Sequence, residues 1–131
     1  MKALTIKQPW LYLIASGQKT IETRTWRTAY RGELLLASSK TFDAGYRSCI
    51  PNGLALVWKN EARIFGQALC IVTLVDCRPM TEADEMAACC RIYPGAYSWV
   101  LENVRCIEPF PVRGLPGLFE IPNSLVEAEG K

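Results

Sequence analysis

The sequence contains no histidine among its 131 residues, and this absence limits the chemistry that any active site could use. Histidine is the usual proton acceptor beside a catalytic serine or cysteine, so Ser-His and Cys-His nucleophile–base pairs are excluded. Any catalysis must therefore depend on lysine, acidic, tyrosine, cysteine or arginine side chains. Histidine is also a common zinc ligand, and the six cysteines are too scattered to replace it. We therefore expect no metal ion and predict no cofactor.

The sequence also lacks a hydrophobic run long enough to cross a membrane, and no signal-peptide pattern follows Met1. None of the six cysteines belongs to a Cys-x-x-Cys pair, and several lie inside apolar runs. We interpret them as reduced, mostly buried thiols. The expected protein is therefore cytoplasmic and contacts no membrane.

Net charge is small, at +2, and does not by itself indicate a nucleic-acid ligand. The charges are unevenly distributed, because residues 19–47 are mainly basic and residues 81–102 mainly acidic. This pattern fits either one basic and one acidic side of the molecule or merely separate solvated surfaces. The length fits a single domain, 1–131, that buries about two-thirds of the surface exposed by the unfolded chain.

Short β-like runs separated by unequal links predict an α+β fold. The clearest strand covers residues 67–75, which are apolar and rich in β-branched side chains. A short helix is expected between Pro9 and Gly17, because proline suits a first helical turn and glycine a helix end. Further helices are expected over residues 42–50 and after Thr81. The other strands are expected at residues 3–7, 19–26, 33–38, 97–105 and 118–121. Together these elements predict a mixed, curled sheet or a small barrel with helices packed on it.

The most informative stretch is residues 17–26, in which a glycine precedes a threonine-rich, β-favouring run. Alternate side chains of a strand share one face. The polar face of this strand is formed by Thr20, Glu22, Arg24 and Trp26, with Lys19 at its mouth. A pocket for a polar, planar ligand could use all of these groups, whereas a strand buried on one side needs none of them. The alternative is a solvated face that carries a Glu–Arg ion pair.

Two further features could contact a ligand. Ser39 and Lys40 leave an apolar strand and could bind phosphate through backbone N–H groups and the ammonium, although they also fit an ordinary polar loop. Trp10, Trp26 and Trp99 could stack on a nucleobase, although a buried tryptophan is more often a core residue.

A motif of the form Gly-x-Lys-x-x-Glu-x-Arg at residues 17–24 follows the segment Leu-Thr-Ile-Lys-Gln-Pro-Trp at residues 4–10, and Ser39-Lys40 follows the third expected strand. With these features the chain resembles the ASCH family of the PUA-like superfamily over nearly its whole length. The ending at residues 107–120, which contains Glu-Pro-Phe-Pro, is similar to the EOLA-like branch of that family. The resemblance implies a small curled β-barrel with short flanking helices.

The resemblance also implies a cleft lined by Lys19, Glu22 and Arg24, in a family associated with RNA binding and RNA-linked regulation. One bacterial branch hydrolyses N4-acetylcytidine with a lysine, a threonine and a glutamate. Lys19 matches that lysine and Arg24 a nearby arginine, whereas Glu22 replaces the threonine and no third residue is carried over. Another relative has been described as a ribonuclease, so RNA cleavage is a further alternative.

We therefore interpret the chain as an RNA- or nucleotide-binding domain that recognises a base or phosphate in a polar cleft, with RNA or a modified nucleoside as the partner. The alternative is a hydrolase in the same cleft, an N4-acetylcytidine-type amidohydrolase or a ribonuclease, with Lys19 and Glu22 as catalytic residues. A protein-interaction module fits less well, because the polar row indicates a small planar ligand. The expected ligand-binding residues are Lys7, Gln8, Trp10, Lys19, Thr20, Glu22, Arg24, Trp26, Ser39, Lys40 and Trp99.

Overall fold

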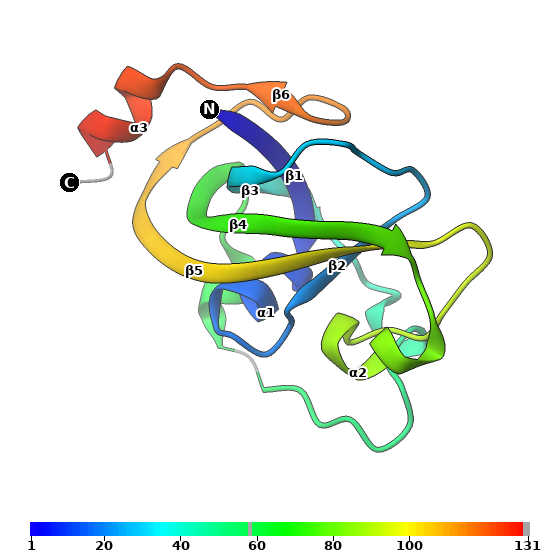
Figure 1. Cartoon of the computed structure of the whole chain (residues 1–131). Coiled ribbons are helices and arrows are strands. Elements are labelled where there is room, and N and C mark those ends of the chain that lie inside the picture. The colour runs from blue at the N-terminus through cyan, green and yellow to red at the C-terminus, as the bar shows by residue number, and fades with distance from the viewer. Residues whose placement is uncertain (58, 130–131) are drawn as a thin grey trace.

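The computed structural model describes residues 1–57 and 59–129, and this part of the chain forms a six-stranded sheet with short helices (Figure 1). The strands are β1 (Lys2–Gln8), β2 (Ile21–Arg24), β3 (Gly32–Phe42), β4 (Gln67–Pro79), β5 (Tyr97–Pro111) and β6 (Phe119–Glu120). The helices are α1 (Trp10–Ala15), α2 (Glu85–Ala88) and α3 (Asn123–Glu129), with short 3-10 turns η1 (Tyr46–Ser48), η2 (Asn60–Arg63) and η3 (Glu82–Asp84). The predicted α+β class is confirmed.

The six strands form one mixed sheet in the order β2-β5-β4-β3-β1-β6. β1 and β3 run parallel, and the other neighbouring strands run antiparallel. β5 bends strongly along its length in Figure 1, so the sheet is curled rather than flat. The expected mixed, curled sheet is therefore confirmed, whereas the closed barrel implied by the resemblance stays a prediction.

One face of the sheet packs against α1. Leu11 and Ile14 of the helix join a buried cluster that includes Leu36 of β3 and Trp99 of β5. The helix ends just before Gly17, whose φ of +86° is a conformation that favours glycine. The predicted helix is thus confirmed, and its end leads the chain directly into β2.

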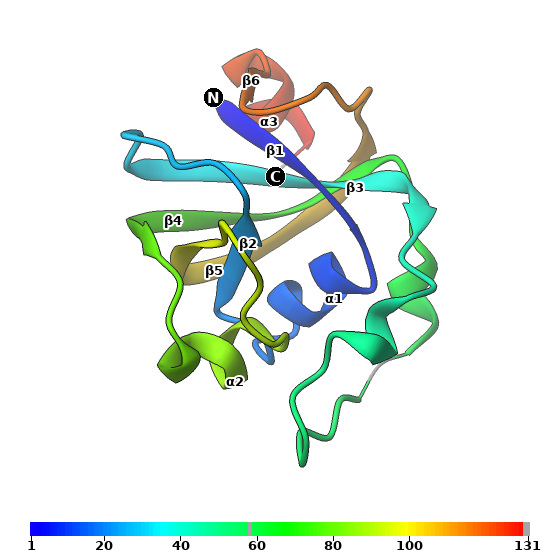
Figure 2. The same cartoon turned by 90° about the vertical axis from the view of Figure 1, so that its right-hand side faces the viewer.

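The opposite face of the sheet carries a second buried cluster, which includes Leu35, Phe110, Phe119 and Val126. β6 and α3 lie together at one end of the protein, away from α2 (Figure 2). The sequence does not predict α3, because a seven-residue helix has too few buried positions to show a helical period.

Two predicted helices are shorter than expected. Within residues 42–50 only the three residues of η1 are helical. After Thr81 the chain forms η3 and then the four-residue α2, which ends at Cys89 in a left-handed conformation. Thr81 and Asp84 nevertheless form a capping box at the start of η3, and this fixes where the turn begins.

All six cysteines are free thiols, and three of them are buried. Burial raises the pKa of the Cys70 thiol to about 12, whereas Cys106, its cross-strand partner, is exposed. The expectation of mostly buried thiols therefore holds for only half of them. In the described ranges, none of the helices has both the length and the apolar character needed to span a membrane.

Candidate functional site

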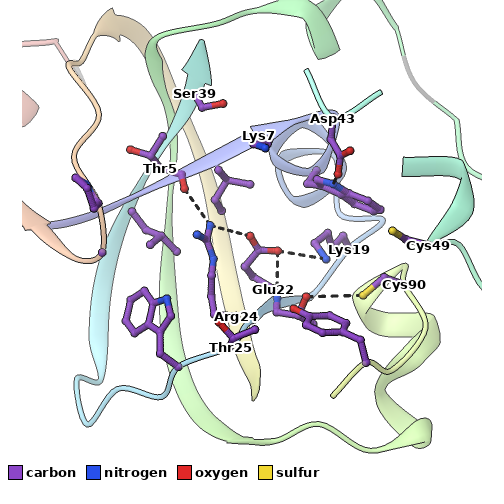
Figure 3. Close-up of a pocket in the computed structure, with 18 of the residues that line it drawn as sticks. Thr5, Lys7, Lys19, Glu22, Arg24, Thr25, Ser39, Asp43, Cys49 and Cys90 are labelled. Carbon is purple, nitrogen blue, oxygen red and sulfur yellow. Dashed lines mark hydrogen bonds and ion pairs between the residues drawn. The ribbon is translucent and has the colours of Figure 1, made fainter. Parts of the chain in front are cut away.

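A cavity of about 790 Å³ lies beside β1, α1 and β2. Its wall is completed by the loop after β3, the turn after α2 and residues 115–117. In the sheet order β1 and β2 are separated by β3, β4 and β5, so neighbouring positions in the sheet do not bring them together. The curl of the sheet does so, and Figure 3 shows the side chains that meet in the cavity.

Lys19 lines this cavity and is nevertheless almost fully buried, with 1% of its surface exposed. Its Nζ donates to the Ala88 carbonyl at 2.5 Å and lies 3.4 Å from Glu22 Oε1. The same nitrogen lies 5.1 Å from the ring centre of Trp10, at a distance typical of a cation–π contact. A buried ammonium is costly unless it is paired and hydrogen-bonded, and these contacts supply the pairing.

Glu22 joins two cations in one network (Figure 3). Its Oε1 faces Lys19 and accepts the N–H of Thr23 at 3.2 Å, while its Oε2 accepts from Arg24 Nη2 at 3.1 Å. Arg24 Nη2 also donates to the Thr5 carbonyl at 2.9 Å. Because Glu22 is only 7% exposed, the alternative of a solvated strand face is wrong.

Two buried polar atoms beside this network have no hydrogen-bond partner in the described part of the chain, namely Arg24 Nε and Thr5 Oγ1. Both hydrogen bonds made by the Arg24 guanidinium use Nη2, so the N–H groups of Nη1 also stay unused among residues 1–57 and 59–129. Gly114 packs directly on Thr5, since a Cβ at this position would lie 2.8 Å from Thr5 Oγ1. This close approach, which requires glycine, holds the turn at 115–117 against the rim of the cavity.

Two tryptophans line the cavity, and a contact with a neighbouring side chain holds each ring. Trp10 donates from Nε1 to Asp43 Oδ2 at 2.8 Å. Trp26 packs edge-on against the buried Trp99 with ring centres 4.8 Å apart. Both rings are therefore fixed in place, as a stacking surface should be.

Tyr93 is a third aromatic side chain of the cavity, and it lies in the turn after α2. It is 37% exposed, so its ring remains accessible. Burial of the rest of the side chain raises the pKa of Tyr93, and a hydrogen bond with Thr23 opposes this effect. The ring is thus positioned by β2 although it comes from a distant turn.

The structure places seven of the eleven expected ligand-binding residues in the cavity lining, namely Lys7, Trp10, Lys19, Glu22, Arg24, Trp26 and Ser39. Gln8 is buried elsewhere, and its amide bonds two backbone groups that fix the start of α1 and the end of η2. Trp99 is a fully buried core residue. Thr20 and Lys40 are exposed and lie outside the lining.

The cavity also contains residues that sequence reasoning missed, and they come mostly from loops and turns. Thr23 was expected on the face opposite Glu22, yet its Oγ1 lies 3.8 Å from Cys90 Sγ within the lining. Because β2 is an edge strand, the cavity extends around its side to the turn after α2. No alternation pattern within one strand indicates such a contact. The other missed polar residues are Thr5, Thr25, Asp43, Ser48, Cys49, Cys90, Arg91 and Tyr93.

The charged lining of the cavity is more basic than acidic. It contains the four cations Lys7, Lys19, Arg24 and Arg91 and the two carboxylates Glu22 and Asp43. Within the described ranges, no group of three or more potential metal ligands is found. The site is therefore characterised by paired charges, unused N–H donors and aromatic rings.

A comparison with protein-family models matches residues 4–111 to the ASCH domain. The match begins within β1, includes β2 to β5 and ends before β6. No curated protein matches the chain.

Proposed function

We propose that this chain, which belongs to the ASCH domain family, binds RNA by accepting a nucleobase into its cavity. The family is linked to RNA binding in general. The observation that carries the proposal is the pairing of the Glu22 carboxylate with the Arg24 guanidinium, 3.1 Å apart in the lining of one cavity. This pairing presents a hydrogen-bond acceptor next to donors, which is what the polar edge of a base requires.

Cytosine is the base that this arrangement fits best. Its exocyclic amine is a donor and could bond Glu22, while the neighbouring ring nitrogen and carbonyl oxygen are acceptors for the unused N–H groups of Arg24. Trp10, Trp26 and Tyr93 offer aromatic surfaces on which the ring could stack. Because the cavity walls would exclude water, the electrostatic interaction energy of each contact would be larger than in solvent.

The test is a titration of cytidine, uridine and short cytosine-, uracil- or adenine-only RNAs against the wild type and Glu22→Gln, at one fixed salt concentration. We expect the wild type to prefer cytosine and Glu22→Gln to change this preference, because a carboxamide presents both a donor and an acceptor. Glu102→Gln, which changes an exposed carboxylate outside the cavity, is the matched control. Failure of the wild type to bind any of these ligands would overturn the proposal.

A hydrolase in the same cavity is the second candidate, and the 3.4 Å separation of Lys19 Nζ and Glu22 Oε1 is the observation that favours it. As a general base, however, Lys19 would need an unprotonated amine, whereas its contacts with the Ala88 carbonyl and the Glu22 carboxylate are those of an ammonium. Binding without turnover is therefore better supported. The hydrolase would become the better-supported function if the wild type deacetylated N4-acetylcytidine or cleaved RNA and if Lys19→Met and Glu22→Gln lost this activity.

Three finer assignments stay predictions. Membership of the EOLA-like branch depends on residues 107–120, most of which lie beyond the family match. The cytoplasmic location is inferred from the free thiols. A protein-interaction module would be favoured only if no nucleoside or RNA bound the cavity.

A further inference from the structure

Two cations at the rim of the cavity have no carboxylate partner. Lys7 and Arg91 line the cavity, both are exposed, and neither forms an ion pair within the described residues. The two other cations of the lining, Lys19 and Arg24, are both paired with Glu22. Each inner cation thus has a carboxylate partner within the protein, whereas the rim cations are available to an anion from outside.

The two rim cations come from different walls. Lys7 belongs to β1, and Arg91 follows Cys90 in the turn after α2. Figure 3 shows Lys7 and Cys90 on different sides of the Glu22 carboxylate. Arg91 is positioned by hydrogen bonds from its guanidinium to the backbone carbonyls of Ser48 and Ile50, neither of which neutralises its charge.

We propose that the ligand of this cavity is an internal nucleotide of a single-stranded RNA, whose flanking phosphates contact Lys7 and Arg91. The inference rests on the proposed function, and it adds which form of the ligand is bound. A free nucleoside would leave both rim cations without a partner, whereas a phosphate on each side of the bound base would pair with both.

A single strand is required because a base held in a cavity cannot remain stacked in a duplex. Taking a base out of a duplex costs several kcal/mol, and this cost is smallest for a base that is already unpaired. Single-stranded RNA also presents its base edges and its phosphates together, and both parts of the site could then be used at once.

The test uses cytidine, cytidine 5′-monophosphate and a labelled hexacytidine RNA, titrated against wild type, Lys7→Gln and Arg91→Gln over a series of salt concentrations. Each variant should weaken RNA binding about two- to five-fold at low salt, as expected for an exposed ion pair. Each should also reduce the slope of log affinity against log salt by about 0.7, the value for one phosphate contact on a single strand. Cytidine binding should not change.

Two controls separate charge from structure. Arg105→Gln removes the same charge outside the cavity lining and should leave RNA binding and its salt slope unchanged. Arg91→Lys keeps the charge but loses the paired carbonyl contacts, so it should retain the salt slope. Thermal unfolding of every variant shows whether it is folded. If Arg91→Gln does not fold, Lys7→Gln still tests the proposal.

The outcomes distinguish this inference from the function on which it rests. If cytidine binds but Lys7→Gln and Arg91→Gln both keep the wild-type affinity for RNA and its salt slope, the phosphate contacts are overturned and the proposed function stands. Equal affinities for cytidine 5′-monophosphate and hexacytidine would overturn the claim that the ligand is an internal nucleotide of an RNA strand, because one phosphate would then suffice. If neither cytidine nor RNA binds the wild type, the proposed function itself fails.

Discussion

Arg24 of β2 donates from Nη2 to the backbone carbonyl of Thr5 in β1 at 2.9 Å. Three strands separate β2 from β1 in the sheet, so this hydrogen bond joins two strands that only the curl of the sheet brings together. The same nitrogen donates to Glu22. Arg24 is thus both part of the cavity wall and a link between its two sides, and variants at this position must separate binding from folding.

Replacing Arg24 by alanine should weaken RNA binding by about 1.5–3 kcal/mol, roughly one to two orders of magnitude in affinity. The reason is the loss of charge-assisted donors next to Glu22. The measurement is a titration of cytosine-only RNA at fixed salt, with unfolding followed separately. Arg24→Lys keeps the charge without the planar fork and should fall between wild type and Arg24→Ala. Equal affinities for wild type and a folded Arg24→Ala would contradict the role of this side chain.

Lys19 and Glu22 should stabilise the fold jointly. Removing either charge leaves its buried partner less compensated, so Lys19→Met and Glu22→Gln should each cost up to about 3–5 kcal/mol of unfolding free energy. The double variant should cost less than the sum, with a coupling of about 0.5–3 kcal/mol. Urea unfolding of the four proteins measures this cycle.

The exposed ion pair between Lys2 and Glu120, 2.9 Å apart, is the matched control for this cycle. Solvent and salt screen it, so its coupling should be much smaller than that of Lys19 and Glu22. Equal coupling free energies for the two pairs would show that burial does not strengthen the interaction between Lys19 and Glu22.

Asp84 should make the stability dependent on pH in the acid range. Burial raises the pKa of Asp84, but hydrogen bonds from Ser98, the Thr81 N–H and Arg78 outweigh this effect and hold the pKa below its ordinary value of 3.8. Such a group stabilises the fold above the pKa of the unfolded chain, and its contribution is lost as pH falls through the lower folded pKa. Asp84→Asn should therefore be less stable than wild type near neutral pH, and the difference should shrink below pH 3.8.

Urea unfolding of both proteins between about pH 3 and pH 7 measures this difference. Glu82→Gln is the control, because Glu82 belongs to the same turn but is exposed. A difference between wild type and Asp84→Asn that is constant with pH would show that Asp84 acts through packing alone.

Tyr93 should act as a stacking surface for the base. Tyr93→Ala should weaken RNA binding by about 1–3 kcal/mol, the range found for stacking of a base on an aromatic ring. Tyr93→Phe keeps the ring and should bind nearly as well as wild type, which separates stacking from the hydrogen bond with Thr23. A loss in Tyr93→Phe as large as that in Tyr93→Ala would assign the effect to the hydroxyl instead. Titration with cytosine-only RNA at fixed salt is the measurement.

Local pattern alone determined several parts of this protein. Pro9 and Gly17 mark the boundaries of α1, because the first favours a helix start and the second a left-handed helix end. The β-branched run that begins at Gln67 became β4. The two-residue period of a strand placed Glu22 and Arg24 on one face, and both line the same cavity.

Only the tertiary structure decided how the cavity is completed. Thr5, Tyr93 and Arg91 reach it from β1 and from the turn after α2, through contacts between residues far apart in the chain. It also decided that Gln8 supports α1 and that Lys19 is buried against the Ala88 carbonyl. A sequence period reports which side chains share a face of one element. It cannot report which elements the curl of the sheet brings opposite that face, because this depends on packing and loop closure across the whole chain.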